Sequence, residues 1–199
     1  MNTLKIFMLI YLVVFYATAF FWRSWRTWRE TGINPYRLNH GDALHRLVGQ
    51  WYRVITAGVA GSVLIYALVP AWYAYLAPIA WLEETAVRNT GIAVLLFSLV
   101  WVLAAQAQMK NSWRIGIDTE HETTLVTGGI FRRSRNPIFI GMRVNLLGVF
   151  LILPNAVTLT LWILGDVLIQ FQVLMEEAFL QKQHGPAYEQ YCRQVRRWL

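Results

Sequence analysis

The sequence is short of charge. Only 15% of its 199 residues are Asp, Glu, Lys or Arg, whereas a typical soluble domain carries about 25%. It has one cysteine, Cys192, so an intrachain disulfide is excluded. With four histidines and no HExxH-type pattern, we expect no metal site. Neither internal repeats nor low-complexity stretches are visible. This composition argues against a soluble globular protein, a disordered tail and a collagen-like fibre.

Apolar and aromatic residues are abundant instead. The hydrophobic fraction is 56%, the mean hydropathy is +0.38, and the chain has ten Trp, nine Tyr and ten Phe. A net charge of +7 would suit a nucleic-acid partner. The basic residues flank apolar runs, however, which is the distribution typical of membrane proteins. We therefore expect membrane lipids as partners and no nucleic acid.

Three uncharged runs predict membrane-spanning helices at 6–22, 54–82 and 89–109, because about 20 apolar residues cross the hydrocarbon core. Prolines interrupt the second run, whose helix is expected to end between Pro70 and Ala77. The first run could be a signal peptide. It has no small-residue cleavage site, and an arginine- and tryptophan-rich stretch follows it directly, which favours a span.

The apolar region 138–175 is too long for one crossing. Pro154-Asn155 lies in its middle and is a turn signal. We therefore predict two helices, 138–153 and 156–175, in a tight hairpin. Arg143 and Asp166 fall within them, and ionisable groups inside a bilayer are usually paired or functional. A buried structural pair is the interpretation we prefer.

Positive residues mark the cytoplasmic side of a membrane protein. Applied to the loops, this rule predicts an all-α protein with about five transmembrane helices, the N-terminus outside and the C-terminus cytoplasmic. The predicted organisation is three N-terminal helices in 1–109 and a second region in 110–199. A basic interfacial segment, 23–53, anchors at the surface or binds lipid headgroups. A basic, aromatic amphipathic helix closes the C-terminal part.

The segment 125–141 combines a flexible turn with positive charge. Gly128-Gly129 permits close backbone approach, three arginines follow at 132–135, and Asn136-Pro137 starts the next helix. A helix N-terminus with free N–H groups favours a carboxylate or phosphate. The alternative is simple positive-inside flanking of a span.

Glu176 and Glu177 lie near the cytoplasmic exit of the last predicted span. Two carboxylates near a helix C-terminus oppose the helix dipole, so a cationic partner is expected. That partner is either the arginine cluster or a cationic ligand. After a break at Gly185-Pro186, Tyr188 and Tyr191 fall one turn apart on a further helix.

In this order the motifs resemble the isoprenylcysteine carboxyl methyltransferase family and its phospholipid methyltransferase relatives. These are integral membrane enzymes that use S-adenosylmethionine. The resemblance covers about residues 110–199, and its motifs are Leu125-Val126-Thr127-Gly128-Gly129, Arg135-Asn136-Pro137, Glu176-Glu177 and Gly185 with Tyr188 and Tyr191. Asn136 replaces the family histidine, as in prokaryotic-type members, and Phe139 replaces the family tyrosine. An asparagine cannot act as a general base, so a prenylated C-terminal cysteine does not follow as the substrate.

The resemblance implies methyl transfer from S-adenosylmethionine to a lipophilic carboxylate, amine or thiol at the cytoplasmic face of a prokaryotic inner membrane. The catalytic residues it implies are Arg135, Asn136 and Glu177, with Glu177 as the base if the acceptor is an amine. The cofactor-binding residues it implies are Leu125, Val126, Gly128, Gly129, Ile130, Arg135, Asn136, Pro137, Glu176, Glu177, Tyr188 and Tyr191.

Two other functions remain open from the sequence. Membrane sterol reductases have a similar C-terminal region, and the arginines at 132–135 could take the 2′-phosphate of NADPH. A non-enzymatic transport or assembly protein could use Arg143 and Asp166 as a relay, although no inverted repeat is visible.

Overall fold

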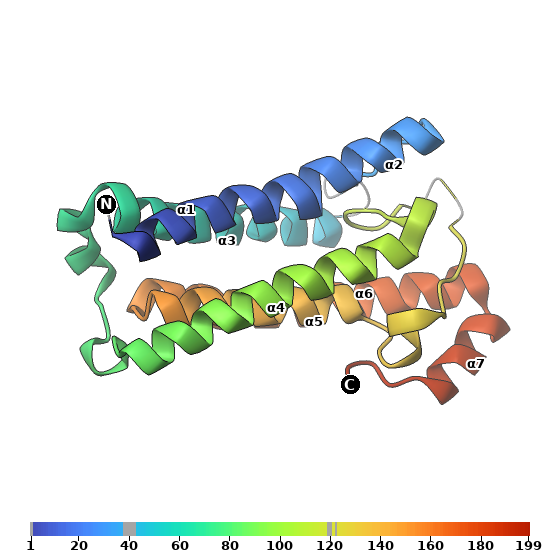
Figure 1. Cartoon of the computed structure of the whole chain (residues 1–199). Helices are drawn as coiled ribbons and strands as arrows, with labels where there is room; N and C mark the ends of the chain where they lie inside the picture. The colour runs from blue at the N-terminus through green and yellow to red at the C-terminus, as the bar shows by residue number, and fades with distance from the viewer. Residues whose placement is uncertain (1, 38–42, 119–120, 122) are drawn as a thin grey trace.

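The structure, a computed structural model, describes residues 2–37, 43–118, 121 and 123–199. Nearly all of it is helical (Figure 1). The α-helices are α1 (Thr3–Tyr16), α2 (Arg23–Thr31), α3 (Ala43–Leu68), α4 (Thr85–Met109), α5 (Pro137–Ile152), α6 (Ala156–His184) and α7 (Pro186–Gln194). Over the described ranges, β-pairing is limited to two isolated bridges, Tyr36 with Ile115 and Pro78 with Asn155. The predicted all-α class is confirmed.

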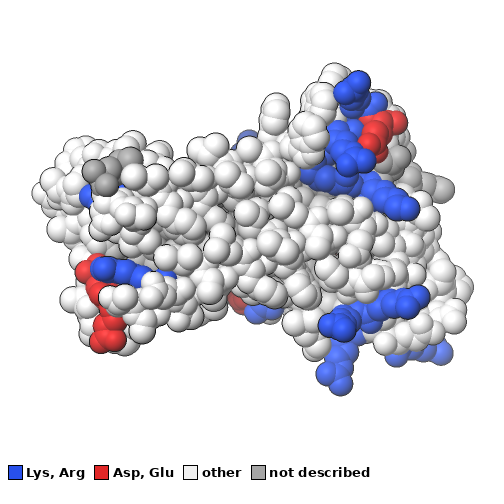
Figure 2. Space-filling model, viewed as in Figure 1, with Lys and Arg blue, Asp and Glu red and all other residues white. Residues whose placement is uncertain are grey.

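Four helical stretches are long and apolar enough to cross a membrane: Thr3–Thr31, which joins α1 to α2, and the helices α3, α4 and α6. Helix α5 is apolar but shorter, at 16 residues. Figure 2 shows Lys and Arg gathered at the end of the molecule where α2 and α7 lie, and a middle section with few charges. An apolar middle with basic residues at one end is what a bilayer selects. The chain is an integral membrane protein.

The first two predicted spans differ from the observed helices at their ends. The first continues through a π-helical segment, Ala17–Trp22, into α2, so the basic segment 23–53 is divided between α2 and the start of α3. Residues 38–42 of that segment lie outside the described part of the chain. The second helix ends at Leu68, earlier than predicted. Its early end follows from Pro70, which disfavours the α conformation for the residue before it.

The helices pack as a ring. Helix α1 packs on α3, α3 on α6, α6 on α5 and α5 on α4, and the π-helical segment contacts α4 to close the ring. The π segment is tied there, because the buried Gln106 Nε2 donates to the carbonyl oxygen of Ala19 at 2.8 Å. A π turn commonly marks a functional part of a helix. Inside the ring, Tyr11 donates its hydroxyl to the Leu95 carbonyl oxygen at 3.0 Å.

The predicted hairpin is confirmed. Helix α5 ends at Ile152 and α6 begins at Ala156, with the Asn155 side chain accepting from the Thr158 N–H at 2.9 Å in a capping box. Helix α6 then runs on to His184, beyond the predicted end at residue 175, because its last turns pack on α7 and do not need lipid around them.

Arg143 and Asp166 form the predicted ion pair across the hairpin. Their side chains are 33% and 28% exposed, so the pair lies on the flank of α5 and α6 and is not buried. The Trp198 ring packs over the Arg143 guanidinium, whose carbon lies 4.6 Å from the ring centroid. The pair therefore also holds the C-terminal segment against the hairpin.

Helices α4 and α5 pack closely because glycines face the contact. A Cβ added to Gly141 would lie 2.4 Å from Val102 Cγ2, and one added to Gly148 would lie 2.7 Å from Leu95 Cδ2. Val102 and Leu95 are both buried and cannot move away freely. This close packing fixes the start of α5, where the candidate site lies.

We predict that Gly141→Ala lowers the stability of the protein relative to Gly61→Ala by about 1–3 kcal/mol, the cost of overpacking a core contact. Gly61 is the matched control, since it is helical and its added Cβ meets nothing within 4 Å. Thermal unfolding in detergent measures the difference. Equal stability of the two variants would contradict the close α4–α5 contact.

Candidate active site

A cavity of about 390 Å³ is lined by residues from the part of the helix ring next to α2 and α7, the basic end. Its walls are mostly apolar and come from parts of the chain far apart in sequence. The lining includes Tyr16 and Phe20, Tyr52, Arg53 and Thr56 of α3, residues 112–118, Phe131, Arg135–Phe139 and Met142, and Gln172, Glu176, Phe179 and Leu180 of α6. A mostly apolar cavity with a few polar groups is typical of a small-molecule site.

One side of this cavity is covered by two segments that pair with each other. Tyr36 and Ile115 form a parallel bridge, in which the Arg37 N–H donates to the Ile115 carbonyl oxygen at 2.8 Å. Beneath them the buried carboxylate of Asp118 meets Arg114 at 3.0 Å and Arg37 at 3.5 Å. The ion pairs fasten the segment before α3 to the segment after α4, and both segments border the cavity.

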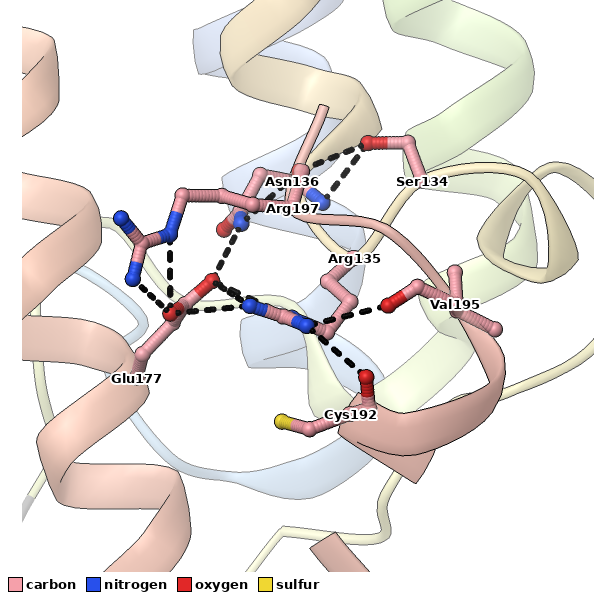
Figure 3. Close-up of polar contacts among 7 residues, drawn as sticks. All are labelled: Ser134, Arg135, Asn136, Glu177, Cys192, Val195 and Arg197. Atoms are coloured by element: carbon pink, nitrogen blue, oxygen red, sulfur yellow. Dashed lines mark hydrogen bonds and ion pairs between the residues drawn. The ribbon is translucent and has the colours of Figure 1, made fainter. Parts of the chain in front are cut away.

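Beside the cavity, Arg135 and Glu177 form a nearly buried ion pair (Figure 3). Arg135 Nη2 lies 3.1 Å from Glu177 Oε1, and the two side chains are 13% and 11% exposed. Arg135 Nη1 also donates to the carbonyl oxygens of Cys192, at 3.3 Å, and Val195, at 3.0 Å. The arginine therefore connects α6 to the end of α7.

Glu177 accepts from two further side chains. Asn136 Nδ2 donates to Glu177 Oε1 at 2.9 Å, and Arg197 Nη2 donates to Glu177 Oε2 at 2.9 Å. A carboxylate has about four lone-pair sites, and here three side chains use them. We call this set of four residues, Arg135, Asn136, Glu177 and Arg197, the clamp. The expected cationic partner of Glu177 is Arg135 of the arginine cluster, joined by Arg197 of the C-terminal segment.

Glu176, the adjacent residue, lines the cavity. No hydrogen bond or ion pair joins its side chain to any other residue that the structure describes. Consecutive residues of a helix point about 100° apart, which is why one glutamate enters the clamp and the other faces the cavity. The two adjacent carboxylates therefore have different surroundings.

Backbone amides of the glycine–arginine loop donate within the chain. Ile130 N donates to Gln108 Oε1 at 2.7 Å, Phe131 N to Gly128 O at 3.1 Å, and Asn136 N to Ser134 Oγ at 3.0 Å. Gly129 has a φ of +59°, and its added Cβ would lie 2.1 Å from Gln108 Oε1. Gly129 thus lets the loop approach α4, whereas a Cβ added to Gly128 would meet nothing within 4 Å.

Tyr188 and Tyr191 form a small core with Val195, against which Leu125 packs. The Tyr191 hydroxyl donates to the Phe131 carbonyl oxygen at 2.6 Å, and burial raises the pKa of Tyr191 to about 12. These tyrosines hold α7 against the loop. Leu125 and Tyr191 also border a separate surface depression, which Thr127 and Gln190 share.

The residues proposed from the sequence therefore divide into three groups. Arg135, Asn136, Pro137 and Glu176 line the cavity. Leu125 and Tyr191 border the separate depression. Val126, Gly128, Gly129, Ile130, Glu177 and Tyr188 line neither.

Sequence reasoning missed the cavity residues of the N-terminal helices, Tyr16, Phe20, Tyr52 and Thr56. Tyr16 and Thr56 had one signal, a hydroxyl group inside an apolar run, whereas Phe20 and Tyr52 had none that marked them as site residues. The arginines at 132–135 do not converge, because Arg132 and Arg133 are exposed and Arg135 turns into the clamp. They do not form the common phosphate site that an NADPH enzyme would need.

A family model described as phospholipid methyltransferase matches residues 86–187, just over half of the chain. The chain belongs to the phospholipid methyltransferase family. The matched segment includes α4, α5, α6 and the loops that line most of the cavity. This membrane protein is therefore a methyltransferase, and neither the reductase nor the non-enzymatic alternative gains support.

A curated relative, the protein-S-isoprenylcysteine O-methyltransferase of Schizosaccharomyces pombe, is 29% identical over 192 residues. The similarity covers 94% of this chain and 77% of the relative. No solved structure matches the chain. The relative agrees with the family resemblance of the C-terminal motifs and extends it to the N-terminal helices.

We predict that Glu177→Gln destabilises the protein by about 2–3 kcal/mol, because it leaves the Arg135 guanidinium buried without its counter-charge. Arg197→Gln is the matched control. It removes a partner of the same carboxylate that is 42% exposed, and exposed pairs contribute less than about 1 kcal/mol. Thermal unfolding in detergent compares the two. A larger loss of stability in Arg197→Gln than in Glu177→Gln would contradict the view that the Arg135–Glu177 pair is the main contact of the clamp.

Proposed function

We propose that this protein transfers a methyl group from S-adenosylmethionine to a lipophilic acceptor in the cavity at the basic end of the helix ring. The observation that carries the proposal is the Glu176 side chain, a carboxylate without a described partner in a mostly apolar cavity. A carboxylate in such a place needs a cationic or hydrogen-bonding ligand to offset the cost of desolvation.

The residues around the cavity suit this cofactor. When bound, S-adenosylmethionine supplies an electrophilic methyl group on a positively charged sulfur. Glu176 provides a negative charge for that cation, and the rings of Phe131, Phe139 and Phe179 provide apolar surface. Arg135 and Asn136 border the same space and shape its rim, while their side-chain N–H groups donate within the protein.

In this proposal the clamp holds the rim of the cavity in place, and methyl transfer takes place inside the cavity. Glu177 holds Arg135 and Asn136 in place at the rim, and it acts through them. The aromatic walls and the paired segments at Tyr36 and Ile115 exclude water, which favours methyl transfer over side reactions. A carboxylate acceptor needs no base. For an amine acceptor, Glu176 is better placed as the base than Glu177, whose oxygens are occupied.

The acceptor classes that we propose come from the comparisons. The family name points to a phospholipid, and the name of the yeast relative points to an isoprenylcysteine carboxylate. Both carry a polar head on an apolar tail, and both would reach the cavity from the membrane. We further propose that the basic end is cytoplasmic in a prokaryotic inner membrane, that residues 110–199 form the catalytic region, and that the helices of 1–109 close its cavity.

We predict that Glu176→Gln weakens S-adenosylmethionine binding by about tenfold, because the variant loses the attraction to the sulfonium charge. Binding of S-adenosylhomocysteine, the neutral product, should change by less than about twofold. Calorimetric titration of the detergent-purified protein with both ligands measures the two affinities, and NADPH serves as a parallel ligand.

Thermal unfolding of Glu176→Gln and Glu177→Gln separates effects on ligand binding from effects on folding. Glu176→Gln should be at least as stable as the wild type, because it removes a carboxylate that has no described partner, whereas Glu177→Gln should be less stable. Saturable NADPH binding without binding of either methyltransferase ligand would contradict the proposed function. Equal weakening of both sulfur ligands by Glu176→Gln would contradict the electrostatic role of Glu176.

A further inference from the structure

Two different parts of the chain build the cavity. The family match covers 86–187, which supplies the walls at α4, α5 and α6. Tyr16, Phe20, Tyr52 and Thr56 come from the N-terminal helices, outside that match. Methyl transfer is common to the family, whereas the acceptors named for the family and for the yeast relative differ. A wall outside the shared segment is the natural place for acceptor recognition.

Tyr52 is the polar group of that wall that lacks a partner. Its hydroxyl oxygen is buried and makes no hydrogen bond with any residue that the structure describes. Tyr52 and Glu176 line the same cavity. Buried polar groups are almost always hydrogen-bonded, and an unmade bond is costly. We therefore expect an atom of a bound ligand to be the hydrogen-bond partner of the Tyr52 hydroxyl.

We propose that Tyr52 recognises the methyl acceptor, its hydroxyl forming a hydrogen bond with the acceptor's polar head. The inference rests on the proposed function. The head lies between α3 and α6, beside Glu176, and the apolar tail lies against residues such as Phe20 and Met142. Tyr52 exchanges no proton with the acceptor. A carboxylate accepts the hydrogen bond from Tyr52, whereas an amine can bridge Tyr52 and Glu176.

Tyr52→Phe tests this role because it removes only the hydroxyl. Two probe acceptors are used in detergent, N-acetyl-S-farnesylcysteine for a carboxylate head and dioleoylphosphatidylethanolamine for an amine head. Labelled S-adenosylmethionine is kept at saturation. The KM for whichever probe the enzyme methylates should rise about three- to tenfold, which corresponds to the free energy of one hydrogen bond. The kcat and the Kd of S-adenosylhomocysteine should each stay within about twofold.

Tyr66→Phe is the matched control. Tyr66 lies on the same helix, α3, where its ring packs edge-on against Tyr73 at a centroid distance of 5.4 Å, and it does not line the cavity. Its KM should equal that of the wild type. The unfolding temperature of Tyr52→Phe should not fall, because no hydrogen bond to a described residue is lost. A merely structural Tyr52 would leave the KM unchanged.

The outcomes separate this inference from the proposed function. An unchanged acceptor KM in Tyr52→Phe, with normal S-adenosylhomocysteine binding, overturns the role of Tyr52 alone. Weaker S-adenosylhomocysteine binding in Tyr52→Phe also overturns it, because Tyr52 would then contact the methyl donor. If wild-type protein fails to bind S-adenosylhomocysteine, the result contradicts the proposed function and therefore also this inference, which rests on it.

Discussion

The carboxylate of Glu177 connects three parts of the chain that lie far apart in sequence. It meets Arg135 and Asn136 before α5, it belongs to α6, and it takes Arg197 from the C-terminal segment. Because its pair with Arg135 is nearly buried, removing either partner leaves a desolvated charge. The rim of the cavity, the start of α5 and the end of the chain all depend on this one anion. The remaining packing, including the close α4–α5 contact, sets the distances over which the clamp can form.

Two adjacent glutamates can serve different purposes because a helix turns each residue about 100° from the last. Glu177 is satisfied by the protein itself. Glu176 faces a mostly apolar cavity with no described partner. The clamp makes the rim of the cavity rigid. In the proposed function, the Glu176 carboxylate inside the cavity is the anion that faces the sulfonium group of the cofactor. An enzyme whose main task is to align two reactants and exclude water gains from such a rigid rim.

Apolar runs and turn chemistry were enough to predict the long apolar helices but not all of their ends, the hairpin at Pro154-Asn155, and the pairing but not the burial of Arg143 with Asp166. They did not predict the π-helical segment at Ala17–Trp22, which a tertiary hydrogen bond from Gln106 ties to α4. For the site, the motifs located Arg135, Asn136 and Glu176 near one another. The sequence could not reveal that the loop amides pair internally with Gln108 and Ser134. Nor could it bring Tyr52 of α3 to the same cavity, because that proximity depends on how the ring closes.

The central claim is that the methyl donor binds in the cavity between the N-terminal helices and α6. Ultraviolet irradiation of the purified protein with methyl-labelled S-adenosylmethionine, followed by peptide mapping, tests it directly. The account predicts label within 131–142 or 172–180, which carry aromatic rings that line the cavity. Label confined to 125–127 and 187–194, which border the separate depression, would contradict it.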